Sequence, residues 1–312
     1  GKIMNVGKIL NIKYPILQGG MTNVSRAETA AAVSNAGGLG MIATGGFSPE
    51  QIRQEIRKIK TLTDKPFGVN LVLMHPQIEE INKIVIEEGV NIVASGAGNP
   101  APYFESWLEN DIKVLPVIAN IKMAKKVEKL GATSCIFEGN EAGGHIGVLN
   151  TMAALPAIVD AVDIPVVSAG GIYTGKQVLA AEALGAQGVQ MGTRFLVGEE
   201  TEVHENYKNL LVDAKDSDTI VTGFYSGHPV RVVRNKLADK LWELEKEAAP
   251  ASEFEKYGTG ATRKACIDGD MEWGSIMAGE GLAYLTKIEP VKDIIENVMA
   301  EYKDAKNALC QG

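Results

Sequence analysis

The chain has 312 residues, with 31 Lys and Arg against 39 Asp and Glu, and a formal net charge of −8. It contains 34 glycines, where an average usage of ~7 % would give about 22. Hydrophobic residues make up 45 % and the glycines follow no short repeat, which excludes a collagen-like or disordered chain. The acidic balance, without a Lys/Arg run, argues against nucleic acid or an anionic membrane as a partner.

The three cysteines, Cys135, Cys266 and Cys310, are too few and too widely spaced for a disulfide framework or a metal site. We therefore expect free thiols, no metal and a cytoplasmic protein. The most apolar long stretch, residues 153–172, is interrupted by Asp160 and Asp163, so we expect no membrane span.

Short apolar or β-branched runs recur along the first two thirds of the chain and predict strands. In chain order they are Tyr14–Leu17, Gly38–Ala43, Phe67–Leu73, Asn91–Ala94, Lys113–Ile118, Thr133–Phe137, Pro165–Ser168 and Gly188–Met191.

Segments with apolar residues at helical spacing separate these runs. They are Ala27–Ala36, Pro49–Leu62, Ile78–Glu88, Ala101–Glu109, Ile121–Leu130, Met152–Ala161 and Gly175–Leu184. Four of these helices are followed by a glycine that suits a left-handed C-cap, at Gly37, Gly89, Gly131 and Gly185.

About eight strand–helix units of about 25 residues predict a parallel sheet, because each crossover helix returns the chain to start the next strand in the same direction. Eight units favour closure into a (β/α)8 TIM barrel over an open doubly wound sheet. The fold class is therefore α/β, with the barrel over residues 1–203.

The pattern changes after Arg194. An acidic stretch and a polar stretch lead to a charged amphipathic helix at Leu237–Ala249, and the chain ends in another helix at Ile288–Ala308. We interpret residues 204–270 as a smaller inserted region after strand eight. Residues 271–312 then return to the barrel, where the final helix packs.

Glycine-rich loops follow the seventh and eighth predicted strands, where barrels commonly hold phosphate groups. These loops are Ser168-Ala169-Gly170-Gly171-Ile172 and Gln190-Met191-Gly192-Thr193-Arg194. Each alone is also compatible with an ordinary tight turn. Together, at the predicted active face, they indicate a phosphorylated cofactor or substrate.

His145 is the candidate catalytic residue. It lies between glycines in the segment Glu138-Gly139-Asn140-Glu141-Ala142-Gly143-Gly144-His145-Ile146-Gly147, after the sixth strand. Its ordinary pKa near ~6.5 suits proton transfer at neutral pH. For His75 and His204 a structural or solvated role is the simpler interpretation, whereas His228 is open between the two.

Two further strand ends supply polar groups that can contact a flat heterocycle: Gln18-Gly19-Gly20-Met21 after strand one, and Gly68-Val69-Asn70 in strand three. A P-loop, an early GxGxxG and a Ser/His/Asp order are absent from the sequence, which disfavours nucleoside triphosphate and acyl-enzyme chemistry.

The chain resembles, over nearly its whole length, the FMN-dependent enoyl-acyl-carrier-protein reductase II family of bacterial type II fatty acid synthesis, within the nitronate monooxygenase (2-nitropropane dioxygenase) superfamily. The matching segments are YPILQGGM, AVSNAGGLGMI, LTDKPFGVN, GAGNP, EGNEAGGHIG, IPVVSAGGI, ALGAQGVQMGTRF, GHPVRVVRNKL and DGDMEWGSIMAG. LTDKPFGVN and the last two segments are more similar to the reductase branch than to the rest of the superfamily.

The resemblance implies one FMN on the barrel's active face, NADH or NADPH as electron donor, and an acyl carrier protein that delivers a trans-2-enoyl thioester. It implies His145 beside the flavin ring, where it orients or protonates the substrate, and a homodimer. The cofactor-binding residues that it implies are Gly19, Gly20, Met21, Asn70, Ser95, Glu138, Gly143, Gly144, Ala169, Gly170, Gly171, Met191, Gly192 and Thr193. On the substrate side it implies Thr22, Asn23, His228, Ser275 and Met277.

One position departs from the reductase pattern. Such reductases commonly have Ala-Trp after the GGM motif, whereas this chain has Thr22-Asn23. We expect this exchange to replace an aromatic wall near the ring by small polar groups, and so to affect the acyl substrate rather than flavin binding. Two alternatives stay open: a nitronate monooxygenase that uses FMN and oxygen, and a non-redox phosphate-binding isomerase or lyase with His145 as base.

Overall fold

A computed structural model describes residues 4–312, and eight parallel strands form its central sheet. Their order around the sheet is β1-β9-β8-β6-β5-β4-β3-β2. A bridge between Leu17 and Leu39 joins its two ends, with Gln18 N donating to Leu39 O at 2.9 Å. The predicted (β/α)8 barrel is confirmed. The strands are β1 Ile16–Gln18, β2 Gly40–Ala43, β3 Phe67–Val72, β4 Ile92–Gly96, β5 Lys113–Ile118, β6 Cys135–Glu138, β8 Val166–Ala169 and β9 Gly188–Met191.

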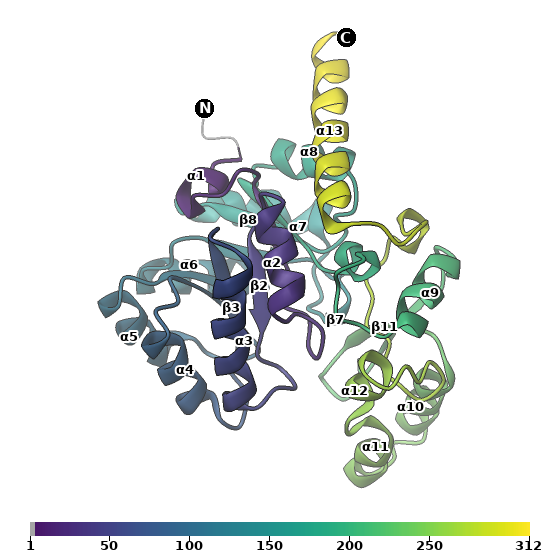
Figure 1. Cartoon of the computed structure of the whole chain (residues 1–312). Helices are drawn as coiled ribbons and strands as arrows, with labels where there is room; N and C mark the ends of the chain where they lie inside the picture. The colour runs from purple at the N-terminus through teal and green to yellow at the C-terminus, as the bar shows by residue number, and fades with distance from the viewer. Residues whose placement is uncertain (1–3) are drawn as a thin grey trace.

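Helices surround the barrel as the apolar spacing predicts (Figure 1). They are α2 Ala27–Asn35, α3 Pro49–Leu62, α4 Ile78–Glu87, α5 Phe104–Glu109, α6 Ile121–Leu130, α7 Thr151–Ala161 and α8 Gly175–Ala183, with short 3-10 turns η1 Ala101–Tyr103 and η2 Thr193–Val197. The four predicted C-cap glycines have φ of 103°, 70°, 101° and 102°, which confirms their left-handed conformation.

A short helix before the first strand, α1 Val6–Leu10, was not expected from the sequence. Its Val6 and Leu10 are buried against barrel-interior side chains such as Leu17, Leu39 and Leu115. This helix therefore covers one end of the barrel interior. Five residues give too short a periodic pattern to be recognised in a sequence.

The chain between the barrel and its C-terminus forms a second group of elements beside the barrel (Figure 1). They are α9 Glu205–Asp213, β10 Thr219–Thr222, β11 Val230–Val233, α10 Lys236–Lys246, α11 Ala251–Gly258, α12 Ala261–Cys266 and the 3-10 turn η3 Leu282–Tyr284. Helix α10 matches the predicted amphipathic helix, but the hairpin of β10 and β11 was missed. The division at residues 203 and 270 stays a prediction.

The hairpin connects the two groups. Strand β11 pairs antiparallel with β10 and with β7, a two-residue strand at Gly144–His145 in the loop after β6. The register aligns Val230 with His145 and Arg231 with Gly144. The loop that carries His145 is thus the edge of a three-stranded sheet whose other strands belong to the inserted region.

The final helix, α13 Val291–Cys310, packs on α8 and α2 through a stripe that includes Val291, Ile294, Ile295, Val298 and Met299. Its last turns extend beyond the body of the molecule (Figure 1). Cys135 and Cys266 are buried free thiols and Cys310 is exposed. Among residues 4–312, no helix combines the length and the apolar character needed to cross a membrane.

Candidate active site

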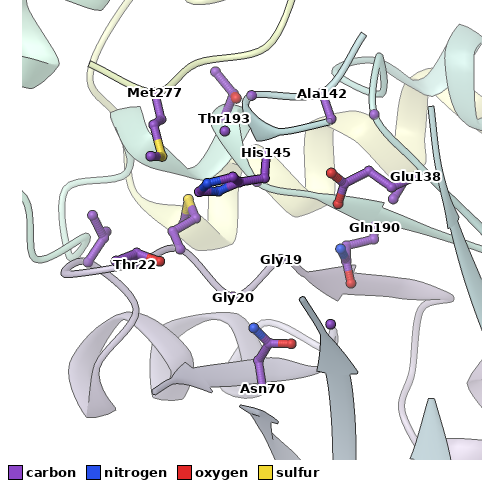
Figure 2. Close-up of a pocket in the computed structure, with 18 of the residues that line it drawn as sticks. Gly19, Gly20, Thr22, Asn70, Glu138, Ala142, His145, Gln190, Thr193 and Met277 are labelled. Carbon is purple, nitrogen blue, oxygen red and sulfur yellow. The ribbon is translucent and has the colours of Figure 1, made fainter. Parts of the chain in front are cut away.

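A cavity of about 560 Å³ lies at the carboxyl ends of the barrel strands, between the barrel and the inserted region. Figure 2 shows the loops after several strands converging on it, with His145, Thr193 and Met277 on one side and Gly20 and Asn70 on the other. A volume of this size suits a cofactor or small ligand.

The two glycine-rich loops present free backbone N–H groups to this cavity. Gly170 and Gly171, after β8, have φ of 89° and 75°, a conformation that a side chain would strain. Within residues 4–312, the amides of these glycines and of Gly192 and Thr193 donate no hydrogen bond. Several unpaired amides on one wall suit an anionic oxygen cluster such as a phosphate.

The Thr193 side chain contacts the returning segment. Its hydroxyl accepts a hydrogen bond from Gly279 N at 2.9 Å. It therefore fixes the returning segment after residue 274 against the loop that follows β9, while its backbone N–H stays free.

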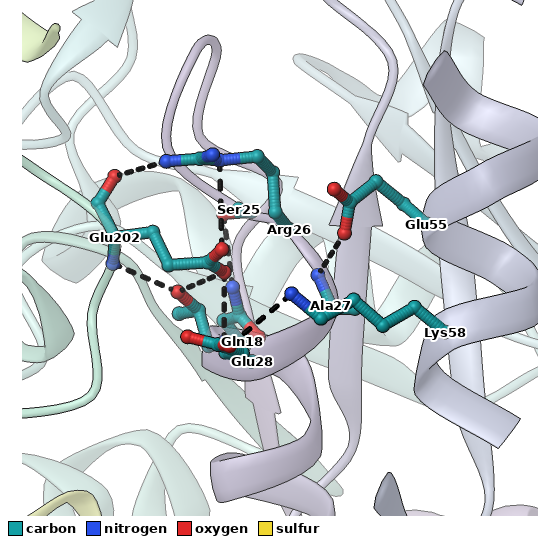
Figure 3. Close-up of polar contacts among 9 residues, drawn as sticks. Gln18, Ser25, Arg26, Ala27, Glu28, Glu55, Lys58 and Glu202 are labelled. Atoms are coloured by element: carbon teal, nitrogen blue, oxygen red, sulfur yellow. Dashed lines mark hydrogen bonds and ion pairs between the residues drawn. The ribbon is translucent and has the colours of Figure 1, made fainter. Parts of the chain in front are cut away.

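The loop after β1 is organised by a residue that the sequence analysis did not select. The Ser25 hydroxyl accepts a hydrogen bond from Gln18 Nε2 at 2.9 Å (Figure 3). It also accepts one from Met21 N at 2.9 Å. Gln18 Oε1 in turn accepts from Met41 N at 3.0 Å. These bonds fix the backbone of Gly19 and Gly20, and the serine lies outside the GGM motif, which is why the motif alone did not reveal it.

Gly20 lies directly against the Asn70 side chain. A Cβ at Gly20 would be 2.5 Å from Asn70 Nδ2, so a side chain at this position would displace the amide. Asn70 points into the cavity from β3 (Figure 2), and its backbone oxygen accepts from Thr44 Oγ1 at 2.8 Å. The two residues form the floor of the site.

His145 lies at the mouth of the cavity, at the point where β7 meets β11. Partial burial, and then the nearby charge of His228, lower the pKa of His145 below its ordinary value. Gly143 allows the loop to approach the returning segment closely, because a Cβ there would lie 2.6 Å from the Ala278 carbonyl carbon and from Gly279 N.

Glu138 enters the cavity from the end of β6 (Figure 2). Burial raises the pKa of its carboxyl to about 7. In the described part of the chain this carboxyl has no hydrogen-bond partner. It can therefore hold or release a proton near neutral pH, and a polar ligand group in the cavity would give it a partner.

Most of the predicted site residues meet at this cavity. Its lining includes Gly19, Gly20, Met21, Asn70, Glu138, Gly143, Gly144, His145, Ala169, Gly170, Gly171, Met191, Gly192 and Thr193, and on the substrate side Thr22, His228 and Met277.

Three predicted residues are not part of the lining. Ser95 is buried on β4 and its hydroxyl has no partner in the described residues. Asn23 is buried with φ of 61° and its side chain packs at Gly46, so the structure brings only Thr22 of the Thr22-Asn23 pair to the cavity. Ser275 lies in the returning segment, where its N–H bonds to Ala261 O at 2.9 Å.

Other lining residues were not found from the sequence. Gln190 is on β9, Tyr173 follows the Gly170-Gly171 loop, and Tyr207 and Cys266 come from the inserted region. Tyr207 is buried and its hydroxyl donates to Met277 O at 2.6 Å. Gln190 could have been selected, because it precedes the Met191-Gly192-Thr193 motif, whereas no local pattern marks Tyr207 or Cys266.

Arg231 holds the His145 loop from the inserted region. Its guanidinium donates from Nε and from a terminal nitrogen to Asn140 O, at 3.2 and 3.0 Å, and pairs with Glu280 at 3.0 Å. The arginine side chain is buried, while that of Glu280 is 52 % exposed. It therefore joins the loop after β6, the hairpin and the returning segment.

A second contact holds the segment that leads into the inserted region on helix α2 and its N-terminus. Glu202 accepts from Thr29 N and Thr29 Oγ1, both at 3.0 Å, and Arg26 donates to Glu202 O at 3.2 Å (Figure 3). Burial raises the pKa of Glu202 despite these bonds. The inserted region is thus attached to α2 as well as to the His145 loop.

The donor set fits FMN. Free amides at Gly170, Gly171, Gly192 and Thr193 suit a phosphate, and the cavity is large enough to receive a polar ring against the wall formed by Gly20 and Asn70. Among residues 4–312, no three His, Cys, Asp or Glu side chains are grouped as metal ligands.

The fold and the site define a β/α-barrel whose cavity carries free backbone amides suited to a phosphate, with a histidine among its lining residues. The chain belongs to the nitronate monooxygenase family, whose model it matches over residues 4–301. It is therefore an oxidoreductase of that family.

Known proteins of two kinds resemble it. The structure of FabK from Thermotoga maritima is 44 % identical, covers 98 % of both chains and superposes with a TM-score of 0.96. A nitroalkane oxidase from Streptomyces ansochromogenes is 27 % identical, with a TM-score of 0.85, over 97 % of this chain and 99 % of that one. A probable nitronate monooxygenase from Staphylococcus saprophyticus is 33 % identical over 96 % of this chain and 97 % of its own length.

Proposed function

We propose that the protein is an FMN-dependent reductase of trans-2-enoyl thioesters carried on acyl carrier protein, with NADH or NADPH as electron donor. The observation that carries this proposal is the similarity to FabK, an enoyl-acyl-carrier-protein reductase II. The two chains are 44 % identical, and the match covers 98 % of each, so it includes the inserted region. The nitroalkane oxidase covers as much of the chain at 27 % identity.

In this proposal the amides of Gly170, Gly171, Gly192 and Thr193 hold the FMN phosphate. Gly20 leaves room for the ring beside the Asn70 amide, and Glu138 meets a polar group of the cofactor or substrate. Bound FMN supplies the two-electron chemistry that the side chains themselves cannot perform. Ser25 fixes the backbone of the loop after β1 and so maintains the shape of that wall.

His145 is the proposed catalytic residue. Reduction of the double bond adds a hydride equivalent to the β-carbon of the enoyl thioester and a proton to its α-carbon. His145, at the mouth of the cavity, would orient the thioester or provide that proton. Thr22, Met277 and His228 line the same opening and would contact the substrate.

A nitronate monooxygenase activity is the second candidate, because the family and the staphylococcal relative carry that name. Thr22 also favours this candidate, because it places a small polar side chain at the cavity wall.

We further propose that the enzyme is a cytoplasmic homodimer. Sedimentation of the purified protein tests the dimer directly.

Spectroscopy and turnover together test the proposed function. Purified protein should show the absorption of bound flavin, NADH or NADPH should bleach it, and a crotonyl thioester should restore it anaerobically. Turnover with an alkyl nitronate and oxygen but not with any enoyl thioester would favour the second candidate. Protein that stays colourless after addition of FMN would favour a non-redox isomerase or lyase.

A further inference from the structure

Five large apolar side chains are exposed to solvent on the two segments that flank the β7–β11 pairing, beside the cavity residues His145 and His228. Val148, Leu149 and Met152 follow His145 on the barrel, and Phe224 and Tyr225 form the tip of the β10–β11 hairpin. Their exposed fractions reach 72 % at Val148, 71 % at Met152 and 87 % at Tyr225. We call these five residues the apolar rim.

The two parts of the apolar rim are joined by backbone contacts. Strands β7 and β11 pair at His145 and Val230, and Ile146 N donates to Pro229 O at 3.1 Å. Val148 therefore follows the paired residue His145 by three positions, and Tyr225 precedes its partner Val230 by five positions. Large exposed apolar side chains gathered at one place indicate an interaction surface rather than scattered surface residues.

Lysines stand beside this rim on α6. Helix α6 packs against α7, and a Cβ at Gly147 would lie 3.5 Å from the Cβ of Ala119, which precedes the N-cap of α6. Lys122, Lys125 and Lys126 are exposed on this helix. We call these three lysines the basic helix face. The Nζ of Lys126 donates a hydrogen bond to Asn99 Oδ1 at 3.0 Å.

Acidic residues are missing from the same surroundings. Residues 112–127, 142–159 and 219–233 contain no Asp or Glu, although the chain has 39 of them. Three nearby carboxylates are occupied: Glu141 accepts from Thr151 N, Glu128 accepts from Asp163 N and Ile164 N, and Glu280 pairs with Arg231. Exposed acids stand further out, on α5 at Glu105 and Glu109 and near the end of α7 at Asp160. An acidic protein thus presents an apolar and basic surface beside the loop that carries His145.

We propose that the apolar rim and the basic helix face dock the acidic carrier protein that delivers the enoyl thioester on its phosphopantetheine arm. This inference rests on the proposed function. A partner with an acidic, partly apolar helix would place its acids on the lysines and its apolar residues on the rim, and the thioester would then pass His145 into the cavity.

The test compares one enoyl group on two carriers. The variant Lys122→Glu/Lys125→Glu reverses two charges of the basic helix face, and Lys292→Glu/Lys303→Glu makes the same charge change at exposed positions on α13, which packs on α8 and α2. Each enzyme is assayed, in its FMN-loaded form, with crotonyl-acyl-carrier-protein and with crotonyl-N-acetylcysteamine, which has neither protein nor charge.

The docking surface predicts a fall of about tenfold or more in kcat/KM for the carrier-bound substrate, mostly through KM, in the first variant alone. The small thioester should be turned over equally by all three enzymes. Added salt should lower kcat/KM for the carrier-bound substrate more in the wild type than in the Lys122→Glu/Lys125→Glu variant, because salt screens the lysine charges that the variant lacks. Met152→Gln/Tyr225→Ser should reproduce the same selective loss through the apolar rim.

Two results overturn the docking surface: equal losses with both substrates, or no loss with the carrier-bound one. A wild-type dimer that dissociates in Met152→Gln/Tyr225→Ser would also overturn it, because the rim would then be an interface between copies. Absence of turnover of crotonyl-N-acetylcysteamine by the wild type would instead contradict the proposed function. Anisotropy of labelled butyryl-acyl-carrier-protein, measured with the same variants, then decides the docking surface without any turnover.

Discussion

Glu138 places a carboxyl with a pKa of about 7 in a cavity at the end of β6. The unfolded chain returns this pKa to its ordinary value of 4.5, so between these values the folded protein holds a proton that the unfolded one releases. Stability therefore falls as pH rises through this window.

Glu138→Gln should remove that dependence. We expect FMN-free wild type to lose about 3 kcal/mol of unfolding free energy relative to this variant between pH 4.5 and pH 7.5. Urea unfolding at several pH values measures the difference, with Glu80→Gln on the surface as control. Parallel stability curves for wild type and Glu138→Gln would show that the carboxyl is not buried as described.

The environment of His145 at the cavity disfavours its charged form. The pKa of His145 is lowered by burial first and by His228 second, so its imidazolium forms at lower pH than that of an unperturbed histidine. His228→Gln should raise the pKa of His145, because the repulsion disappears. An NMR titration of labelled histidines measures it, with His75→Gln as a remote control; an unchanged or lower midpoint in His228→Gln contradicts the coupling.

Gly171 and Gly89 offer a matched pair of left-handed glycines. Their φ values are 75° and 70°, but Gly171 lines the cavity whereas a Cβ at Gly89 would meet nothing within 4 Å. Both alanine variants should lose about 1 kcal/mol of stability. Only Gly171→Ala should weaken FMN binding, by about tenfold or more in a fluorescence titration. Equal FMN affinity in the two variants would remove Gly171 from the cofactor site.

At the scale of elements, alternation of short apolar runs with amphipathic segments was sufficient to predict the barrel. Each barrel strand is buried and each helix has one apolar face, so both periodicities are written locally. The glycine loops and His145 could be predicted as well, because strand ends in a barrel share one face.

The hairpin of β10 and β11 could not be predicted in the same way. Its strands have four residues each, and their partner β7 has two residues in a glycine-rich loop more than 70 positions earlier. The pairing depends on tertiary structure rather than on local propensity. Tyr207 and Cys266 were missed for the same reason, since only the folded insertion brings them to the cavity.

Arg231 tests how far the hairpin positions the His145 loop. Arg231→Met removes the hydrogen bonds to Asn140 O and the pair with Glu280. Because Glu280 stays hydrated, we expect a loss of about 2 kcal/mol rather than the larger cost of a stranded buried charge. Amide exchange at residues 140–147 should accelerate. Arg234→Met, which removes an exposed pair with Asp239, should change neither; protection of the loop that persists in Arg231→Met would contradict the positioning role.

At the scale of the whole molecule, FMN should stabilise both parts together. The cavity is lined by the barrel, by the inserted region and by Met277 of the returning segment, so the cofactor contacts or adjoins all three. At 100 times its Kd, FMN should add about 2.7 kcal/mol to the free energy of unfolding. Calorimetry with and without FMN measures this effect. If two separate unfolding transitions were seen and FMN left the midpoint temperature of one of them unchanged, the insertion would unfold independently of the barrel.

The pairing of β7 with β11 also limits how this protein can be rearranged. If the inserted region were deleted, the backbone beside His145 would become an open sheet edge, with unpaired groups and a tendency to associate with other chains. An exchange of insertions between relatives would have to preserve the alignment of Val230 with His145, since a shift of one residue would turn every side chain of β11 to the other face. Changes at the hairpin tip, which leave this pairing intact, therefore disturb the fold less than replacement of the insertion as a unit.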